Sequence, residues 1–529
     1  MHVHRIPFQQ IPQFSNKDIA YAVGNPALRP FYQYEVSIEA FAQVIEDKKK
    51  DHTDRQLLVS VLKEQYAQYD PGMLTLANID ALGEDGIFTV TTAHQPSLLT
   101  GPLYFIYKCF STINLAESLN RAYPAYRFVP VFVLGSEDHD FEEINHIQLF
   151  GKKLQWENSE SGPCGKMNTD SLQPLLESLS AILGTSENAQ EILELIRQAY
   201  TAHDTFGAAT VHLVGKLFSE YGLIVLDMNH LEFKRKFEPL MRRELLEQAS
   251  RGLIEVATAG LEAAGFSGQA HAREINLFYM RDQLRERIVQ EGEVYKVLNT
   301  DYSFTREQIL EELAQHPDRF SPNVIMRPLF QEYILPNLAY VGGGGEIAYW
   351  LERKAQFAHF GINFPMLVRR NSVCWIDKNT GKRLDKLGLR VEDLLEDTES
   401  VIRRYVQEHT AAELSLGEEK TALESVFHNI GQKALKIDAT LEKAVLAEAA
   451  KQIKGLEQLE DRLLRAEKQR HEVEINQLRA LREKLFPGNG LQERHDNLLP
   501  YFLAYGWDFF KTLKENLHPL ESGLVVISE

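Results

Sequence analysis

Two short apolar runs, residues 88–92 and 128–134, constrain the fold of this chain more than any other feature. The first run is apolar and β-branched, as is typical of strands. The second is too short and too uniformly apolar for an exposed helix and suits a strand covered on both faces of a parallel sheet. Between them, a turn at residues 100–102 opens a helical pattern, with Pro102 in the first turn where a helix tolerates proline. The stretch therefore predicts a β–α–β unit.

Polar residues follow each of the two predicted strands. His94 comes after the first strand, and the sequence SEDHD, residues 136–140, comes directly after the second. In an open parallel sheet, the loops that follow the carboxyl ends of the strands face the ligand crevice. We therefore expect His94 and this acidic cluster to lie beside each other in one site.

The acidic cluster, residues 136–140, has three possible interpretations. Carboxylates this close raise one another's pKa values, which would supply a general base for an attacking amine near neutral pH. Asp, Glu and His are also ligands of divalent metals, and Glu142 and His146 would share a face with one another on a helix. The third interpretation is a charged turn in solvent. The position after a buried strand favours the general base.

A second informative region, residues 320–376, contains an apolar segment, four glycines at 342–345 and a helical pattern that begins with Glu346. Glycines in this place let the backbone approach a ligand and leave the helix N-terminus for an anion. The spacing matches neither a P-loop nor a dinucleotide fingerprint, and a tight turn is the plain alternative. Arg327, Arg369 and Arg370 are candidate carboxylate clamps. We expect this unit to face the same crevice.

The candidate site follows from these two regions. The catalytic candidates are His94, Asp138, His139 and Asp140. The candidates for binding substrate or nucleotide are Gln95, Thr100, Gly101, Tyr104, Lys108, Glu137, Arg327, Gly343, Gly344, Glu346, Tyr349 and Arg369. His94 would donate a hydrogen bond to a phosphate or a developing oxyanion, and Lys108 would reach a phosphate. No residue is assigned to a metal.

Composition divides the chain into three parts. Residues 1–390 predict an α/β core with a helical insertion at about 168–221. Residues 391–487 are rich in helix formers, and their apolar residues form a narrow seam on charged helices, as in a coiled coil. We expect an antiparallel hairpin that turns near residues 438–448, with the remaining seam left for a second subunit. Residues 488–529 are expected to return to the core.

The charge and the termini limit the possible partners. A net charge of −18 opposes a nucleic-acid surface, which requires clustered Lys and Arg. No apolar run reaches the ~20 residues of a membrane helix, and the amino terminus lacks a secretory signal. We expect a cytoplasmic protein that binds small molecules, without membrane or nucleic-acid partners. Cys109, Cys164 and Cys374 fit neither a zinc motif nor a disulfide framework and are expected to be buried.

Several motifs in a fixed order resemble the bacillithiol-biosynthesis family of cysteine-adding enzymes. They are TAHQPSLLTGPLYFIYK, PVFVLGSEDHDFEEINH, YGLIVLD, RPLFQEYILPNLAYVGGGGEIAYW and QERHDNLLPYFLAYGWDFF. The resemblance implies a Rossmann-like, nucleotidyltransferase-type parallel sheet core with helical insertions, a long antiparallel coiled coil and a homodimer formed through it. It also implies the last step of bacillithiol synthesis, which joins cysteine to the amino group of glucosaminyl-malate. ATP with magnesium is the implied activator of the cysteine carboxylate.

The chain departs from the family pattern at two places. Ala93 stands where the family has a glycine, and PCGK stands where it has an AVGR-like loop, so that Lys166 replaces an arginine. Nothing resembles the Lys-Met-Ser-Lys-Ser loop of tRNA synthetases, and ATP use therefore follows from the fold alone. Two other functions stay open: a metal-dependent hydrolase built on residues 137–146, and a coiled-coil scaffold with a degenerate nucleotide-binding core.

Overall fold

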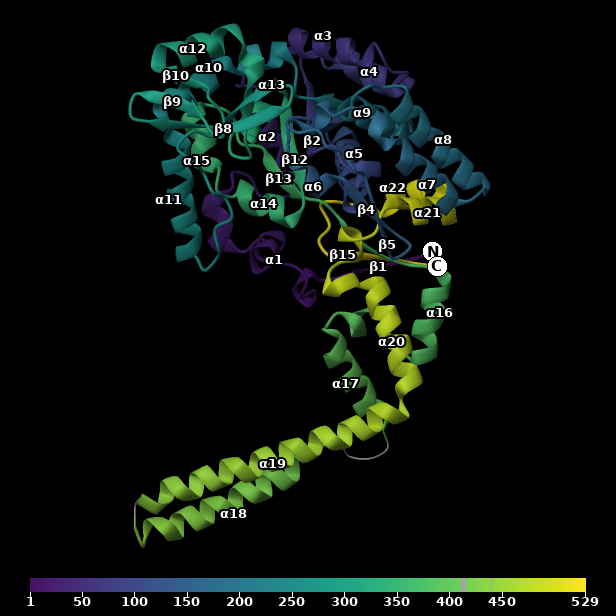
Figure 1. Cartoon of the computed structure of the whole chain (residues 1–529), viewed down its shortest axis with the longest axis vertical. Helices are drawn as coiled ribbons and strands as arrows, with labels where there is room; N and C mark the ends of the chain where they lie inside the picture. Colours follow the sequence, from purple (N-terminus) through teal and green to yellow (C-terminus); the bar gives the residue numbers. More distant parts are fainter. Residues whose placement is uncertain (411–414, 439) are drawn as a thin grey trace. The chain divides into compact units, whose positions relative to one another are not determined.

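The computed structural model describes residues 1–410, 415–438 and 440–529, and the chain divides into two compact units (Figure 1). The larger unit comprises residues 3–374 and 492–526. The smaller unit comprises residues 1–2, 375–491 and 527–529. The chain thus leaves the larger unit after residue 374 and enters it again at residue 492.

Five parallel strands form the centre of the larger unit, in the order β13-β12-β2-β3-β6. They are β2 (Ile87–His94), β3 (Arg127–Leu134), β6 (Ile224–Asp227), β12 (Asn337–Gly342) and β13 (Met366–Arg369). Counted along the chain the order is 5-4-1-2-3, which is that of a Rossmann-type sheet. The two strands predicted first are confirmed as β2 and β3. The order reverses between β2 and β12, where such sheets bind ligands.

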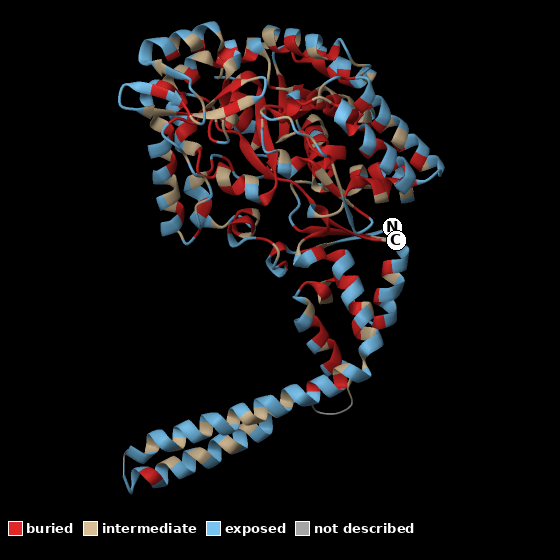
Figure 2. Cartoon of the chain, viewed as in Figure 1, coloured by how far each residue is buried: buried red, intermediate tan, exposed pale blue. Residues whose placement is uncertain are grey.

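Helices cover both faces of this sheet, so most residues of its strands are buried (Figure 2). On one face the core contains Val90 and Phe128 from the strands together with Leu115. On the other face it contains Val131 and Leu226. The covering helices are α2 (Phe41–Lys48) and α5 (Tyr104–Ala122) on the first face, and α3 (Arg55–Tyr66) and α10 (Leu231–Glu247) on the second.

A second, antiparallel sheet has the order β10-β9-β8-β7-β11. Its strands are β7 (Leu277–Arg281), β8 (Leu284–Glu291), β9 (Val294–Val297), β10 (Ser303–Thr305) and β11 (Phe320–Pro322). The sequence of β8, LRERIVQE, is rich in charged residues, so it does not resemble a buried strand. The remaining strands are the hairpin β4 (His146–Leu149) and β5 (Lys152–Gln155), and the three-stranded sheet β1 (His2–Ile6), β15 (Leu524–Ser528) and β14 (Ser372–Ile376).

Three α-helices lie within residues 168–221, the range expected for a helical insertion: α7 (Gln173–Leu183), α8 (Glu187–Thr201) and α9 (Phe206–Leu217). The other α-helices of the larger unit are α1 (Asn16–Ala22), α4 (Met73–Ala81), α6 (Phe141–Ile144), α11 (Ala249–Ala263), α12 (Arg306–Gln315), α13 (Arg327–Ile334), α14 (Gly344–Trp350), α15 (Lys354–Phe360), α21 (Leu498–Tyr505) and α22 (Trp507–Asn516). Across the residues that the structure describes, no helix combines the length and apolar character needed to cross a membrane.

The smaller unit is helical. Its helices are α16 (Lys378–Leu387), α17 (Thr398–His409), α18 (Gly417–Leu435), α19 (Thr440–Arg470) and α20 (Glu472–Leu485). Helices α18 and α19 lie side by side and antiparallel, since Lys420 near the start of α18 pairs with Glu460 in the second half of α19 at 2.6 Å (Figure 1). The turn expected near residues 438–448 includes residue 439, which lies outside the described residues.

Candidate active site

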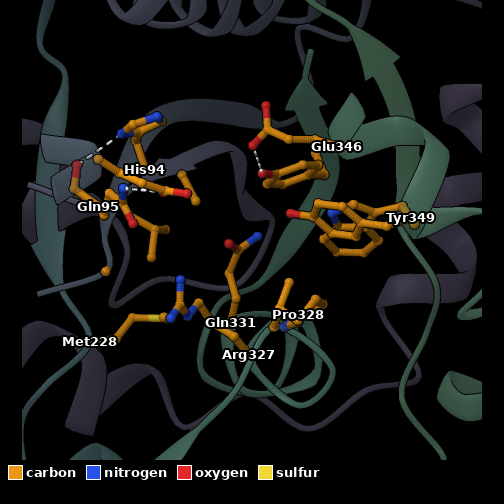
Figure 3. A pocket seen from close by; sticks show the side chains of 15 residues that line it. His94, Gln95, Met228, Arg327, Pro328, Gln331, Glu346 and Tyr349 are labelled. Carbon is orange, nitrogen blue, oxygen red and sulfur yellow. Dashed lines mark hydrogen bonds between the residues drawn. The ribbon is translucent and has the colours of Figure 1, made fainter. Parts of the chain in front are cut away.

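The carboxyl ends of the parallel strands border a cavity of about 210 Å³, where the order of the sheet reverses (Figure 3). In the register of β2 and β3, His94 is paired with Leu134, so both following loops start at the same edge. The polar side chains of this first cavity are His94, Gln95, Glu143, Arg327, Gln331, Tyr340, Glu346 and Tyr349. The first cavity therefore lies at the position expected for a ligand site in this fold.

A second cavity of about 400 Å³ adjoins the first. His94, Gln95 and Glu143 line both cavities. The other polar side chains of the second cavity are Ser97, Tyr104, His146, Gln148, Arg494 and His495. Two molecules bound in the two cavities would meet at the three shared residues.

His94 ends β2, and both nitrogens of its imidazole have partners. Nδ1 lies 2.9 Å from the backbone oxygen of Gln95, which only accepts hydrogen bonds, so Nδ1 carries the proton. Nε2 then accepts from the Tyr104 hydroxyl at 3.1 Å. Burial and the nearby Lys108 ammonium lower the pKa of His94 to about 4, so the ring is neutral at pH 7. In this arrangement His94 presents an acceptor, whereas the sequence suggested a donor.

Glu346 lies opposite His94 in the first cavity and is held as a carboxylate. Its Oε1 atom accepts from Lys108 at 2.8 Å and from the Tyr340 hydroxyl at 2.7 Å, and Oε2 accepts from the backbone N–H of Gly343 at 2.8 Å. Burial would raise the pKa of Glu346, but these partners hold it below its usual value. Lys108, expected to reach a phosphate, is instead buried beneath Glu346 with 1% of its side chain exposed.

Asp138 lines neither cavity, and its carboxylate is paired with two arginines. Oδ2 accepts from Arg327 at 3.1 Å, and Oδ1 lies 3.7 Å from Arg285. Burial would raise the pKa of Asp138, but the two guanidinium groups lower it to about 2. A carboxylate with this pKa is a poor general base near neutral pH. Asp138 therefore contributes to the first cavity by holding Arg327.

The other members of the acidic cluster are also turned away from the cavities. Glu137 is buried, forms an ion pair with Lys234 and accepts from the Ser321 hydroxyl at 2.7 Å. The Nδ1 atom of His139 accepts from Arg285 at 2.6 Å, and burial and this guanidinium lower the pKa of His139. Asp140 is exposed just before α6.

These pairs also bear on the metal interpretation of residues 137–146. The carboxylates of Glu137 and Asp138 face cations, so they are already neutralised. Within residues 1–410, 415–438 and 440–529, no three His, Cys, Asp or Glu side chains are placed to hold one metal ion. The described part of the chain thus offers no ligand set for the metal-dependent hydrolase considered above.

Arg369 and Gly344 connect the site to the amino-terminal arm. The Arg369 guanidinium donates to both oxygens of Asp18 at 2.7 and 3.0 Å and lies over the rings of Phe8 and Phe14. A Cβ at Gly344 would lie 2.0 Å from an Asp18 oxygen, so glycine is required there for packing. Neither residue lines the first or the second cavity. Arg369, a candidate clamp for a substrate carboxylate, therefore binds a carboxylate of the protein itself.

Some of the remaining candidate residues line a cavity, and others are buried away from both cavities. Gln95 lines both cavities and donates to Glu143 at 3.1 Å, and Tyr349 lines the first cavity. Gly101 lines the second cavity and has a φ of 64°, a conformation that favours glycine. Thr100 and Gly343 are buried and line neither cavity.

Several lining residues were not predicted. Gln331 and Tyr340 lie within the second informative region, and their positions before and within β12 could have suggested them. Arg494 and His495 lie in the segment after the coiled coil, and no local pattern indicates that they face a site. Asp227 ends β6, and burial raises its pKa to about 6, although it lines neither cavity.

Comparison with known families assigns this arrangement of domains. A family model described as "Bacillithiol biosynthesis BshC, N-terminal Rossmann-like domain" matches residues 1–371, and "Bacillithiol biosynthesis BshC, C-terminal coiled-coil domain" matches residues 373–529. The chain belongs to the BshC family. The family predicted from the motifs is confirmed, as are a Rossmann-like domain with a parallel sheet and a coiled-coil domain.

Named members of the BshC family resemble this chain over its whole length. Three of them carry the name "Putative cysteine ligase BshC". The protein from Flavobacterium psychrophilum is 42% identical, with 99% of this chain and 98% of the relative covered. The proteins from Flavobacterium johnsoniae and Christiangramia forsetii are 40% and 38% identical, with at least 99% of each chain covered. These names agree with the predicted class of enzyme, a ligase.

Proposed function

We propose that the protein joins cysteine, through an amide bond, to the amino group of glucosaminyl-malate in the last step of bacillithiol biosynthesis. The observation that carries this proposal is the pair of cavities that share His94, Gln95 and Glu143, because a ligase must bring two substrates together. The name of the relatives supports cysteine as one substrate, and the family description supports the pathway. The resemblance of the motifs supplies the second substrate.

Cysteine suits the first cavity. The Glu346 carboxylate and the Arg327 guanidinium enter it from different sides (Figure 3). The ammonium group of an amino acid would face Glu346, and its carboxylate would face Arg327. A volume of about 210 Å³ suits a small amino acid better than a sugar conjugate. The larger substrate would then occupy the second cavity.

The junction of the two cavities is where the new bond would form. The neutral His94 ring and the Tyr104 hydroxyl form a fixed hydrogen-bonded pair there. Because this pair is held by the protein before substrate binds, little reorganisation is needed when charge develops. We assign to His94 the role of orienting the Tyr104 hydroxyl at the reacting centre, through the hydrogen bond that Nε2 accepts from it.

A free carboxylate must be activated before an amine can displace its oxygen, and we assign this activation to ATP with magnesium. The first cavity offers no ready triphosphate site: Arg327 is paired with Asp138 and Lys108 with Glu346, and the Glu346 side chain caps the first turn of α14. The residues that line the first cavity therefore do not fit the phosphates. The assignment depends on the reaction and on a nucleotidyltransferase-type core, for which the strand order is the support.

We further propose that two copies of the chain associate through the coiled coil. Four residues of its apolar seam, Val426, Ile430, Leu459 and Leu463, remain 43–52% exposed although α18 and α19 pack together. An apolar row on an otherwise charged pair of helices suits association with a second copy. Sedimentation of the intact protein tests this, and a monomer at micromolar concentration would contradict it.

Product analysis tests the proposed function. Purified protein is incubated with cysteine and glucosaminyl-malate, with and without ATP and magnesium, and the products are identified by mass spectrometry. We expect bacillithiol to form only when ATP is present. Bacillithiol formed at the same rate without ATP would contradict the proposed activation, and no product with any of these mixtures would contradict the proposed reaction.

A further inference from the structure

The segment after the coiled coil, residues 492–497, is fixed at both ends against the larger unit. At one end Glu493 is fully buried and accepts from both Arg370 nitrogens at 2.8 and 3.0 Å. At the other end the Asn497 amide donates to the backbone oxygens of Leu99 and Gly101 at 3.0 and 2.6 Å. This short turn is therefore bound to the loop that joins β2 to α5.

Between these two anchors the turn presents Arg494 and His495 to the second cavity. The side chain of Arg494 is exposed, and in the described parts of the chain its guanidinium has no hydrogen-bond or ion-pair partner. His146 lines the same cavity. Among the described residues that line the second cavity, Glu143 is the one carboxylate, and it accepts from Gln95. The cavity thus carries a free cation that suits an anionic substrate.

His495 is oriented by its neighbours. Its Nδ1 atom lies 3.0 Å from Oδ1 of Asp496, and Oδ2 of Asp496 accepts from the Tyr501 hydroxyl at 2.7 Å. The backbone oxygen of Asp496 accepts from Leu103 N–H at 2.8 Å, which fixes the residue that does the orienting. Because an ionised carboxylate only accepts, Nδ1 carries the proton and Nε2 is left as an acceptor. This is the arrangement in which an aspartate prepares a histidine to act as a base.

We infer that the second cavity is the subsite of the amine substrate, in which Arg494 binds a carboxylate and His495 removes the proton from the attacking amine. The inference rests on the proposed function, since it assumes an amine acceptor. In the step, the nitrogen–carbon bond forms and the bond from the cysteinyl carbon to the leaving oxygen of its activated carboxyl group breaks. The bonding pair departs with the oxygen of the leaving group. The proton of the amine passes to Nε2 of His495, and Asp496 stabilises the resulting imidazolium.

The test separates amide formation from activation. Hydroxylamine reacts with activated carboxyl groups without help from a base, so it traps activated cysteine as a hydroxamate even if the base is missing. For His495→Gln we expect amide formation with glucosaminyl-malate to fall about 100-fold, with hydroxamate formation unchanged. His52→Gln, an exposed histidine in the loop between α2 and α3, is the matched control and should keep both rates.

Arg494→Ala tests the binding role. Loss of one charged hydrogen bond should raise KM for glucosaminyl-malate about tenfold, with little change in kcat or in KM for cysteine. Arg197→Ala, an exposed arginine on α8, is the control and should change neither constant. Equal melting temperatures of the variants would show that the fold is retained.

Each outcome bears on a different claim. Wild-type protein that forms neither amide nor hydroxamate would overturn the proposed function and this inference together. Active wild-type protein with an equally active His495→Gln variant would overturn the base and leave the proposed function intact. A His495→Gln variant that also loses the hydroxamate would place His495 in activation and would contradict the subsite assigned here.

Discussion

Two polar loops at the carboxyl edge of the sheet differ in what their side chains face. In the acidic cluster after β3, Glu137 and Asp138 are paired with Lys234 and Arg327, which come from distant parts of the chain. In the loop after β2, His94 lines both cavities. A high density of charged residues therefore does not identify the side chain that contacts a ligand. Whether a charged side chain is available to a ligand depends on the partners that other elements place against it.

Burial explains the difference between the two loops. A charged group buried without a partner costs several kcal/mol, so the fold neutralises the carboxylates of the acidic cluster internally. The neutral imidazole of His94 requires no counter-charge and stays at the boundary of the cavities. The acidic cluster thus serves as a frame, and the His94 loop serves as the surface that contacts substrate.

The largest effect is expected from Lys234→Met, which leaves Glu137 buried without its cation. Lys234 is fully buried and also donates to the backbone oxygen of Phe320 at 2.7 Å. We expect a loss of about 3–5 kcal/mol in the free energy of unfolding, measured by urea denaturation. The double variant Glu137→Gln/Lys234→Met removes both charges and should recover part of the loss. Equal stability of wild type and Lys234→Met would contradict the structural role assigned to the acidic cluster.

Asp138→Asn should have a smaller effect than Lys234→Met, and the effect should be on the rate of the reaction. The substitution removes the charge that holds Arg327 and should lower kcat/KM about 10–100-fold through poorer placement of the guanidinium. Because a group with a pKa of about 2 is already ionised, the pH dependence of the rate above pH 5 should keep its shape. A variant that loses the acidic limb of the pH profile would show that Asp138 is the general base after all.

The pH dependence of stability should show the smallest effect. The pKa of His94 is lowered from 6.5 to about 4 by burial and by Lys108, so between these values the unfolded state binds more protons than the folded state. The contribution of His94 to the free energy of unfolding is therefore complete above pH 6.5 and falls as the pH is lowered towards 4. Because His94 borders the cavities, we expect a loss of about 1–2 kcal/mol over this range.

Comparison with His94→Gln isolates this contribution, because other histidines titrate in both proteins. Unfolding by urea at several pH values should show a shallower loss of stability for the variant between pH 6.5 and 4. Parallel curves for the two proteins would mean that His94 is protonated as easily in the folded state as in the unfolded state.

The sequence predicts the sheet better than it predicts the site. Runs at residues 88–92 and 128–134 indicate β2 and β3 because apolar and β-branched residues suit strands that are covered on both faces. Strand β8 escapes prediction because its charged residues conceal its pairing. The role of Asp138 could not be predicted because Arg327 and Arg285 reach it from other elements. The roles of Arg494 and His495 could not be predicted either, since the chain returns to the larger unit only after the coiled coil.

The most direct measurement compares the rates of amide formation by His94→Gln and Asp140→Asn from cysteine, ATP and glucosaminyl-malate. Both variants are first shown to have the same free energy of unfolding. His94 lines both cavities, whereas Asp140 is exposed and lines neither. We predict that His94→Gln loses about 100-fold in rate and that Asp140→Asn stays within about twofold of wild type. An inactive Asp140→Asn variant beside an active His94→Gln variant would contradict the assignment of the reacting surface to the His94 loop.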